Sequence, residues 1–270
     1  MTRTLVQSQF GANAAAYVTS DVHAAGESLK MLVGLANPQP DWTGLDVATG
    51  AGHVALAFAP HVARMIASDI TEEMLAETRA LAESRGIKNV DVAIAAADSL
   101  PFADRSFDLL SCRLAAHHFP EPAAFVGEAA RVLKPGGVFA LVDNVSPDEV
   151  TMPALSRAEA RDMAIIYNQF EKLRDPSHGR ALTAGEWHEV AGDAGLHVTS
   201  QRVIVKEMEF DAWVRRMQCT PETIERLWAM LDPGERCERG QLRDFLLPRR
   251  AGSEVWISLR ELVLVARKPD

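Results

Sequence analysis

The sequence is poor in cysteine and contains no long apolar run. Its three cysteines, Cys112, Cys219 and Cys237, are odd in number and far apart, so they predict neither a disulfide framework nor a C-x-x-C metal pair. The first 18 residues lack the apolar core of a signal peptide, and no stretch of 18 apolar residues occurs, which argues against secretion and membrane spans. We expect a soluble, cytoplasmic protein with no metal centre.

Positive charge is scarce as well. The chain has 28 Lys and Arg residues against 37 Asp and Glu residues, a formal net charge of −9. Nucleic acids and anionic membranes bind basic surfaces, so we expect neither as a partner. The late arginines between residues 215 and 250 are interpreted as solvated helix faces. A chain of 270 residues can form one α/β domain with an elaboration, and a homodimer stays open.

Short β-like runs alternate with helical stretches from about residue 42 to residue 145, which predicts a parallel sheet with crossover helices. The predicted strands here are residues 44–48, 65–69, 90–97, 107–112 and 137–143, and two more follow at 196–205 and 254–267. The predicted helices begin near His53 and Thr71 or span about 20–36, 121–133, 151–174 and 183–195, with two further helices before residue 250.

The stretch LDVATGAGHVA, residues 45–55, joins the first strand to a helix and carries Gly50, Gly52 and Ala55 in the spacing G-x-G-x-x-A. Glycines there let the backbone approach a ligand. Such a turn serves the pyrophosphate of NAD or the amino-acid portion of S-adenosylmethionine, and a tight turn without a ligand is the plainer alternative. Asp69, at the end of the second strand, can accept both hydroxyls of an adenosine ribose, which both cofactors contain.

Two further carboxylates favour the adenosyl cofactor over NAD. Asp46 lies just before the turn, where a carboxylate repels phosphates but suits an ammonium group. Asp98 follows the third strand and could accept a hydrogen bond from an adenine amino group, with Ser99 and Leu100 lining the ring.

An NAD(P)-dependent oxidoreductase is the alternative among enzymes. It would need a hydride-side catalytic set such as Tyr-x-x-x-Lys, but Tyr17 and Tyr167 are followed four positions later by Asp21 and Glu171. The alternative from another class is a catalytically silent accessory protein that keeps adenosyl binding. The intact acidic residues of the cofactor side are the observation against it.

Five segments of the chain resemble one family. LDVATGAGHVA, SDIT, AADSLPF, FDLLSCRLAAHHF and EAARVLKPGGVFALVD, in this order and spacing, are similar to class I S-adenosylmethionine-dependent methyltransferases. The likeness covers roughly residues 40–145 and is greatest to the small-molecule branch that includes the ubiquinone and menaquinone C-methyltransferases. It implies a Rossmann-like α/β fold with a seven-stranded, mostly parallel sheet, an antiparallel last strand, helices on both faces and helical lid elements. The two late predicted strands can fill the last two places.

The resemblance also implies which residues contact S-adenosylmethionine. Those near its methionine part are Asp46, Ala48, Gly50 and Gly52; those near the ribose are Asp69 and Ile70; those near the adenine are Asp98 and Ser99. The backbone at Arg113 is a further cofactor contact, and Tyr17 belongs to an N-terminal segment that in the family folds over the cofactor.

The chain departs from the family pattern at one position of the turn and lacks one motif. Ala48 replaces the first glycine of D-x-G-x-G-x-G, and we expect this alanine to be tolerated with a negative φ. The motif N/D-P-P-Y/F, usual after the fourth strand in enzymes that methylate exocyclic base nitrogens, is replaced by RLAAHHF. This absence argues against DNA as the substrate.

Methyl transfer from a sulfonium needs mainly alignment and desolvation of the reactants. A general base helps when the attacked atom has a proton to lose, and His117 and His118 are the candidates, with His117 preferred. The substrate-binding candidates are His23, Asp143, Asn144 and His178. We expect a small-molecule acceptor, quinone-like, aromatic or another metabolite, methylated on carbon or oxygen.

The resemblance suggests four parts of the chain. They are an N-terminal lid and helix (1–40), the cofactor-binding Rossmann-like core (41–146), a lid insert (147–182) and the rest of the sheet (183–270) with a helical insertion at about 208–250.

Overall fold

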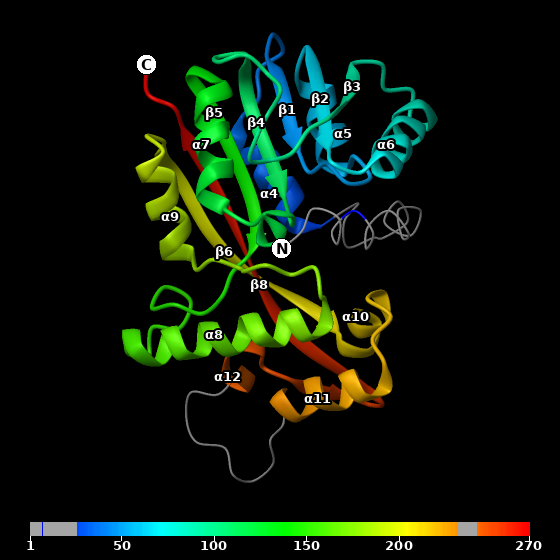
Figure 1. Cartoon of the computed structure of the whole chain (residues 1–270), viewed down its shortest axis with the longest axis vertical. Coiled ribbons are helices and arrows are strands. Elements are labelled where there is room, and N and C mark those ends of the chain that lie inside the picture. The colour runs from blue at the N-terminus through cyan, green and yellow to red at the C-terminus, as the bar shows by residue number, and fades with distance from the viewer. Residues whose placement is uncertain (1–6, 8–25, 232–241) are drawn as a thin grey trace. The chain divides into compact units, whose positions relative to one another are not determined.

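The structure is a computed structural model that describes residue 7, residues 26–231 and residues 242–270, and Figure 1 labels its elements. The sheet has eight strands in the order β3-β2-β1-β4-β5-β8-β6, with β7 paired to β8. Strands β1 to β5 pair with one another in parallel, and the C-terminal strands are antiparallel. The strands are β1 Thr43–Val47, β2 Arg64–Asp69, β3 Val90–Ile94, β4 Phe107–Arg113, β5 Leu133–Asn144, β6 His197–Glu209, β7 Arg249–Ala251 and β8 Glu254–Arg267. The Rossmann-like fold predicted from the sequence is confirmed.

The eighth strand is the difference from the predicted sheet of seven. β7 pairs with the start of β8 as an antiparallel hairpin, and Gly252 in its turn has a φ of 64°. All three residues of β7 are exposed, so no alternation of apolar and polar residues marks it. For that reason the sequence placed it inside a helical insertion.

The described residues form two compact units, which are treated one at a time. Unit 1 comprises the described residues of Met1–Asp143, His188–Arg202 and Val263–Asp270, and unit 2 comprises those of Asn144–Trp187 and Val203–Leu262. The four parts predicted from the sequence stay a prediction, because they assign lid and cofactor functions that compactness does not test.

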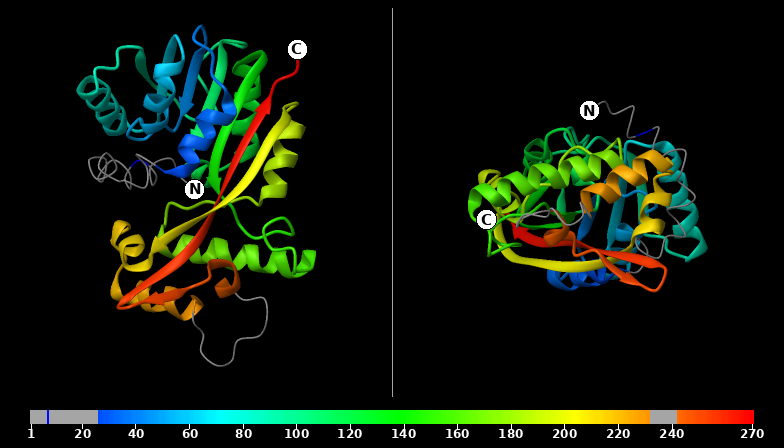
Figure 2. Two further views of the ribbon diagram at one scale, coloured as in Figure 1. Left: turned by 180° about the vertical axis from the view of Figure 1, so that it is seen from behind. Right: turned by 90° about the horizontal axis from the view of Figure 1, so that it is seen from below.

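Unit 1 holds the parallel strands, whose apolar residues form its core. Strands β1, β4 and β5 are buried along most of their length, as parallel strands covered on both faces require. The helices of unit 1 include α4 Glu27–Ala36, α5 His53–Phe58, α6 Glu72–Ser84 and α7 Pro122–Val132. α5 packs on β1, β2 and β4, and α6 packs on β2 and β3. α7 covers the near face of the sheet in Figure 1, and α4 covers the opposite face, which Figure 2 (left) brings to the front.

Unit 2 is built around an amphipathic helix, α8 Arg157–Arg174. The prediction started this helix at residue 151, but a capping box between Ser156 and Glu159 sets its first turn. Tyr167 and Phe170 are fully buried; their rings contact Phe245 and Trp213 at centroid distances of 5.3 Å each. The other helices are α10 Phe210–Arg216, α11 Pro221–Leu231 and α12 Leu242–Leu246, and α9 Ala184–Asp193 begins in this unit.

Helix α9 starts at the predicted capping box. The Thr183 backbone N–H donates to Glu186 Oε2 at 2.8 Å, and the Glu186 N–H donates to Thr183 Oγ1 at 3.1 Å. No helix within the described ranges is both long enough and apolar enough to cross a membrane. Within the same ranges, no group of three or more His, Cys, Asp or Glu side chains is arranged to hold a metal ion.

Candidate functional site

In the turn between β1 and α5, every second residue adopts a left-handed backbone conformation. Ala48, Gly50 and Gly52 have φ values of 52°, 55° and 85°. The expectation that φ stays negative at Ala48 is therefore wrong. The turn needs a left-handed residue at every second position to lead from the strand into the helix, and an L-residue there costs about 1–2 kcal/mol.

Thr78 of α6 supports this turn from below. Its Oγ1 donates to the Gly50 carbonyl oxygen at 2.9 Å. A Cβ atom on Gly52 would lie 2.6 Å from Thr78 Cγ2, whereas one on Gly50 would meet no described residue within 4 Å. Gly52 is thus fixed by packing as well as by φ, and the part of the chain that the structure describes leaves the space beside Gly50 open.

Asp46 is a buried carboxylate that braces the turn. Its Oδ2 accepts from Thr49 Oγ1 at 2.6 Å, and its Oδ1 accepts from Ser111 Oγ at 2.7 Å. Burial raises the pKa of Asp46 to about 6, although these hydrogen bonds act to lower it. The contact of Asp46 with a ligand ammonium group stays a prediction, since its oxygens accept hydrogen bonds from the Thr49 and Ser111 hydroxyls and from the backbone of Ala55.

Asp69 ends β2 beside the same turn. Its Oδ2 accepts from the Gly50 N–H at 3.0 Å, and its Oδ1 accepts from the Thr71 N–H at 2.9 Å. Burial raises the pKa of Asp69, and the hydrogen bonds from Gly50 and Thr71 partly offset this. The carbonyl oxygen of the next residue, Ile70, accepts from the side-chain amide of Gln7 at 2.8 Å.

These features fit the adenosyl cofactor expected from the sequence. The Asp69 carboxylate ends β2 beside the turn and accepts hydrogen bonds from the Gly50 and Thr71 N–H groups and from further groups of Thr71 and Ile70. Its contact with the hydroxyls of a ribose stays a prediction. A Cβ atom on Gly50 would meet no atom of the described residues within 4 Å, so the backbone there can come close to a ligand.

The segment after β3 carries the predicted adenine-side residues. Ala96 and Ser99 form an isolated antiparallel bridge, and Asp98 lies half-buried at its tip. Ser99 is exposed, whereas Leu100 is buried. The bridge therefore presents Asp98 and Ser99 at a bend that follows directly on the sheet edge.

His117 and Asp143 are brought together from two neighbouring strands. His117 lies in a 3₁₀ turn, Ala116–His118, just after β4, and Asp143 lies near the end of β5. His117 Nδ1 and Asp143 Oδ1 are 2.6 Å apart, and both side chains are buried. This contact gives Asp143 an orienting position beside His117, and its predicted contact with substrate stays a prediction.

The Asp143 carboxylate selects a tautomer of His117. A carboxylate accepts a proton-bearing Nδ1, which leaves the basic lone pair of a neutral ring on Nε2. Asp143 Oδ2 is buried and has no hydrogen-bond partner among the described residues. The His118 ring packs on that of His117 with centroids 4.2 Å apart. His117 is therefore held by a carboxylate in a defined orientation.

Three carboxylates share the carboxyl edge of the parallel strands. Burial raises the pKa of the Cys112 thiol well above its usual range, and the negative charges of Asp143, Asp46 and Asp69 add to this rise. The thiol on β4 is thus close enough to be affected by acids on its two neighbouring strands, β1 and β5, and on β2 beyond β1.

The remaining predicted residues are less directly tied to this edge. The Arg113 guanidinium donates from Nε and from Nη2 to Ser28 Oγ of α4, each at 3.3 Å. Asn144, the last residue of β5, is half-buried. The roles of both in ligand binding stay predictions.

His178 is buried inside unit 2. Its Nε2 lies 2.9 Å from Asn168 Oδ1, and its carbonyl oxygen accepts from Lys172 Nζ at 2.6 Å. These contacts tie the loop to α8, and substrate binding by His178 stays a prediction. Tyr17 and His23 lie outside the described residues.

The sequence did not predict the polar residues that support the site through hydrogen bonds to its turn and to Asp46. Thr49, Thr78 and Ser111 fix the turn and Asp46 through their hydroxyls. Ser111 could have been found, because a polar side chain within the buried, mostly apolar strand β4 indicates a hydrogen-bonding role. Glu128 and Arg131 of α7 hold the segment after Asp98, and their i, i+3 spacing was the sign of a pair.

Known proteins similar to this chain point to one enzyme family. Residues 45–141 match the family described as "Methyltransferase domain". The uncharacterized methyltransferase YcgJ of Bacillus subtilis is 36% identical over 210 residues, which are 78% of this chain and 79% of YcgJ. A crystal structure described as that of a methyltransferase from Bacillus halodurans has a TM-score of 0.80 at 35% identity, covering 91% of this chain and all of that one (100%). The ubiquinone/menaquinone biosynthesis C-methyltransferase UbiE of Brucella anthropi is 31% identical over 66% of this chain and 63% of its own.

Proposed function

The chain belongs to the class I S-adenosylmethionine-dependent methyltransferases, and on that premise we propose that it methylates a small-molecule acceptor with His117 as the general base. The observation that carries the proposal is the buried contact of 2.6 Å between His117 Nδ1 and Asp143 Oδ1. A histidine oriented by a carboxylate is the arrangement that lets the opposite ring nitrogen take a proton.

S-adenosylmethionine supplies a methyl group made electrophilic by a sulfonium. The protein's own residues would bind and orient it. Asp69 accepts hydrogen bonds from the ribose hydroxyls, Asp98 accepts one from the adenine amino group, and the backbone at Gly50 lies against the ligand. Asp46 supports these contacts through Thr49 of the turn. His117 Nε2 removes the proton of the attacked acceptor atom, and Asp143 stabilises the resulting imidazolium.

This proton removal favours acceptors whose attacked atom is a phenol oxygen or an enolisable carbon. Both kinds lose a proton during methylation, so an oriented base accelerates the reaction by about 100- to 10,000-fold. Similarity to UbiE, named for ubiquinone and menaquinone biosynthesis, supports a quinol-like or related aromatic acceptor. The net charge of −9 argues against nucleic acid.

The proposal is tested by release of S-adenosylhomocysteine with a panel of reduced quinones, phenols and 1,3-dicarbonyl compounds. We expect turnover of at least one of these acceptors. His117→Gln should lower kcat by about 100-fold, with the affinity for S-adenosylhomocysteine unchanged. Asp143→Asn should lower kcat in the same way because it removes the orienting carboxylate.

The matched control is His61→Gln, since His61 is an exposed histidine in the same unit, and it should leave kcat unchanged. Full kcat in the His117 variant would show that another group takes the proton. Tight cofactor binding with transfer to none of these acceptors would favour the silent accessory protein instead.

A further inference from the structure

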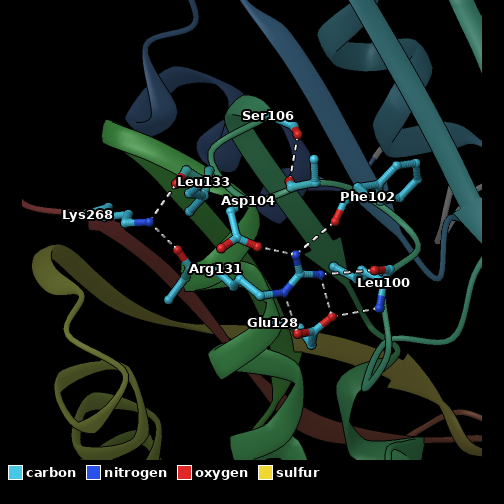
Figure 3. A network of polar contacts seen from close by, with 10 residues as sticks. Leu100, Phe102, Asp104, Ser106, Glu128, Arg131, Leu133 and Lys268 are labelled. Carbon is cyan, nitrogen blue, oxygen red and sulfur yellow. Dashed lines mark hydrogen bonds and ion pairs between the residues drawn. The ribbon is translucent and has the colours of Figure 1, made fainter.

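The segment EAARVLKPGG contains a charged pair on α7 that the methyl-transfer mechanism does not use. Glu128 and Arg131 lie three residues apart, and Figure 3 shows both turned toward the segment that follows Asp98. Their side chains are only 21% and 32% exposed. The pair is therefore partly shielded from water, where charge-assisted hydrogen bonds are stronger than on an open surface.

Arg131 uses every N–H donor of its guanidinium. Nε and Nη2 donate to the two carboxylate oxygens of Glu128 at 2.7 and 2.8 Å. Nη2 also donates to the Leu100 carbonyl at 3.0 Å. Nη1 donates to the Phe102 carbonyl at 2.8 Å and to Asp104 Oδ1 at 2.7 Å. Because arginine has five N–H donors in a planar fork, no other side chain can make this set of contacts.

Glu128 binds the other backbone polar group of Leu100. Its Oε2 accepts from the Leu100 N–H at 2.7 Å, so both polar backbone groups of Leu100 are bonded to the pair. The hydrogen bond from Arg131 lowers the pKa of Glu128, which keeps this acceptor ionised. Leu100 is buried and lies two residues after Asp98, so its position limits where Asp98 can be.

The helix that carries the pair is itself anchored at its C-terminal end. Lys268 Nζ donates to the carbonyl oxygens of Ala130 and Leu133, both at 2.7 Å (Figure 3). A cation on the last carbonyls of a helix satisfies acceptors that have no partner within the helix. The segment 98–102 is thus held against a fixed support rather than against another loop.

We propose that Arg131 and Glu128 are positioning residues for base recognition and set the preference for an adenine over a hypoxanthine. They hold Leu100 so that the carboxylate of Asp98 meets the exocyclic amino group of adenine. Hypoxanthine carries a carbonyl oxygen at that position, which a carboxylate repels. The inference rests on the assignment of Asp98 to the adenine made under the proposed function.

The test compares the affinities of the full-length protein for S-adenosylhomocysteine and S-inosylhomocysteine by calorimetric titration. These ligands differ only at the base, so their affinity ratio reports base selectivity and is insensitive to a general loss of binding. For the unchanged protein we expect the adenosyl compound to bind about tenfold more tightly or better, since one hydrogen bond to a charged group is lost.

Arg131→Gln and Arg131→Lys should each reduce this ratio at least about fivefold, because neither side chain has the five donors of the fork. Two controls remove other contacts in unit 1. Asp104→Asn removes the negative charge of a partner of Arg131 that does not contact Leu100, and Arg64→Gln breaks the exposed pair between Arg64 and Asp91. Both should keep the ratio. Melting curves in the presence of S-adenosylhomocysteine show that each variant is folded.

The outcomes separate two failures. If Asp98→Asn leaves the ratio unchanged, the adenine assignment under the proposed function is wrong. If Asp98→Asn lowers the ratio but both Arg131 variants keep it, or lower the affinities for both ligands equally, the positioning role of Arg131 is refuted. An unchanged ratio in Arg131→Lys alone would also overturn it, because charge without the fork would then suffice.

Discussion

Replacing Asp46 with asparagine removes a charge from a side chain that is only 1% exposed, with little change of shape. The pKa of Asp46 is raised from 3.8 to about 6 by burial. The folded protein thus holds this proton more tightly than the unfolded chain. This tighter proton binding by Asp46 stabilises the folded state fully below about pH 3.8, and the stabilisation is lost as the pH rises through about 6.

The size of the pKa shift of Asp46 sets how much folding free energy is lost. At about 1.4 kcal/mol per pKa unit, a rise from 3.8 to about 6 costs about 3 kcal/mol at neutral pH and roughly half of that at about pH 5. Asparagine avoids this cost but keeps a single acceptor oxygen for Thr49 and Ser111, which costs about 1 kcal/mol. The net expectation is a gain of about 2 kcal/mol at neutral pH.

The assay is thermal or urea unfolding of the cofactor-free protein between about pH 5 and pH 8. Asp46→Asn should melt on the order of 5 °C higher at neutral pH, and its advantage should shrink by about 1.4 kcal/mol toward pH 5. Asp91→Asn is the control, because Asp91 is 58% exposed and paired with Arg64, so its effect should stay within about 0.5 kcal/mol. An Asp46→Asn protein that is less stable at neutral pH, or whose advantage does not change with pH, would refute the reasoning.

Three further predictions concern the turn and its neighbour. Ala48→Gly should raise stability by about 0.5–1 kcal/mol, because relief of the left-handed strain exceeds the extra chain entropy of glycine; equal or lower melting temperature would contradict this. Gly52→Ala should destabilise by about 2–3 kcal/mol, since its Cβ would lie 2.6 Å from Thr78 Cγ2; a thermal melt near that of the unchanged protein would show that Thr78 yields. Asp69→Ala should weaken S-adenosylhomocysteine binding about 100-fold or more by calorimetry, from the loss of two hydrogen bonds to a carboxylate; unchanged affinity would mean that another residue holds the ribose.

The strands of the sheet could be predicted because their signal is local. Buried parallel strands are continuous apolar runs, and the predicted ranges 44–48 and 107–112 overlap β1 Thr43–Val47 and β4 Phe107–Arg113. The predicted range 254–267 coincides with the antiparallel strand β8 Glu254–Arg267. The predicted third strand, 90–97, ended three residues too late, since β3 stops at Ile94 and the bridge from Ala96 to Ser99 follows. The residues of this short reverse turn are as rich in alanine as the end of the strand, so the sequence does not mark where β3 ends.

The site was predictable only in part for a related reason. Acids at strand ends could be located, because the carboxyl ends of parallel strands meet at one edge. The contact between His117 and Asp143 joins residues 26 apart in sequence, and it depends on the register of β4 against β5. The positive φ of Ala48 likewise follows from the path of the backbone, because alanine by itself favours negative φ.

The acids at the carboxyl edge have a consequence for the end of the catalytic cycle. Methyl transfer converts a sulfonium cation into a neutral thioether, so the cofactor loses a positive charge while Asp46, Asp69 and Asp143 stay where they are. Their negative charges add to the rise that burial causes in the pKa of Cys112. With the cofactor bound at this edge, as we propose, the same charges would attract the cationic cofactor more strongly than its neutral product. We therefore expect these carboxylates to favour exchange of product for fresh cofactor.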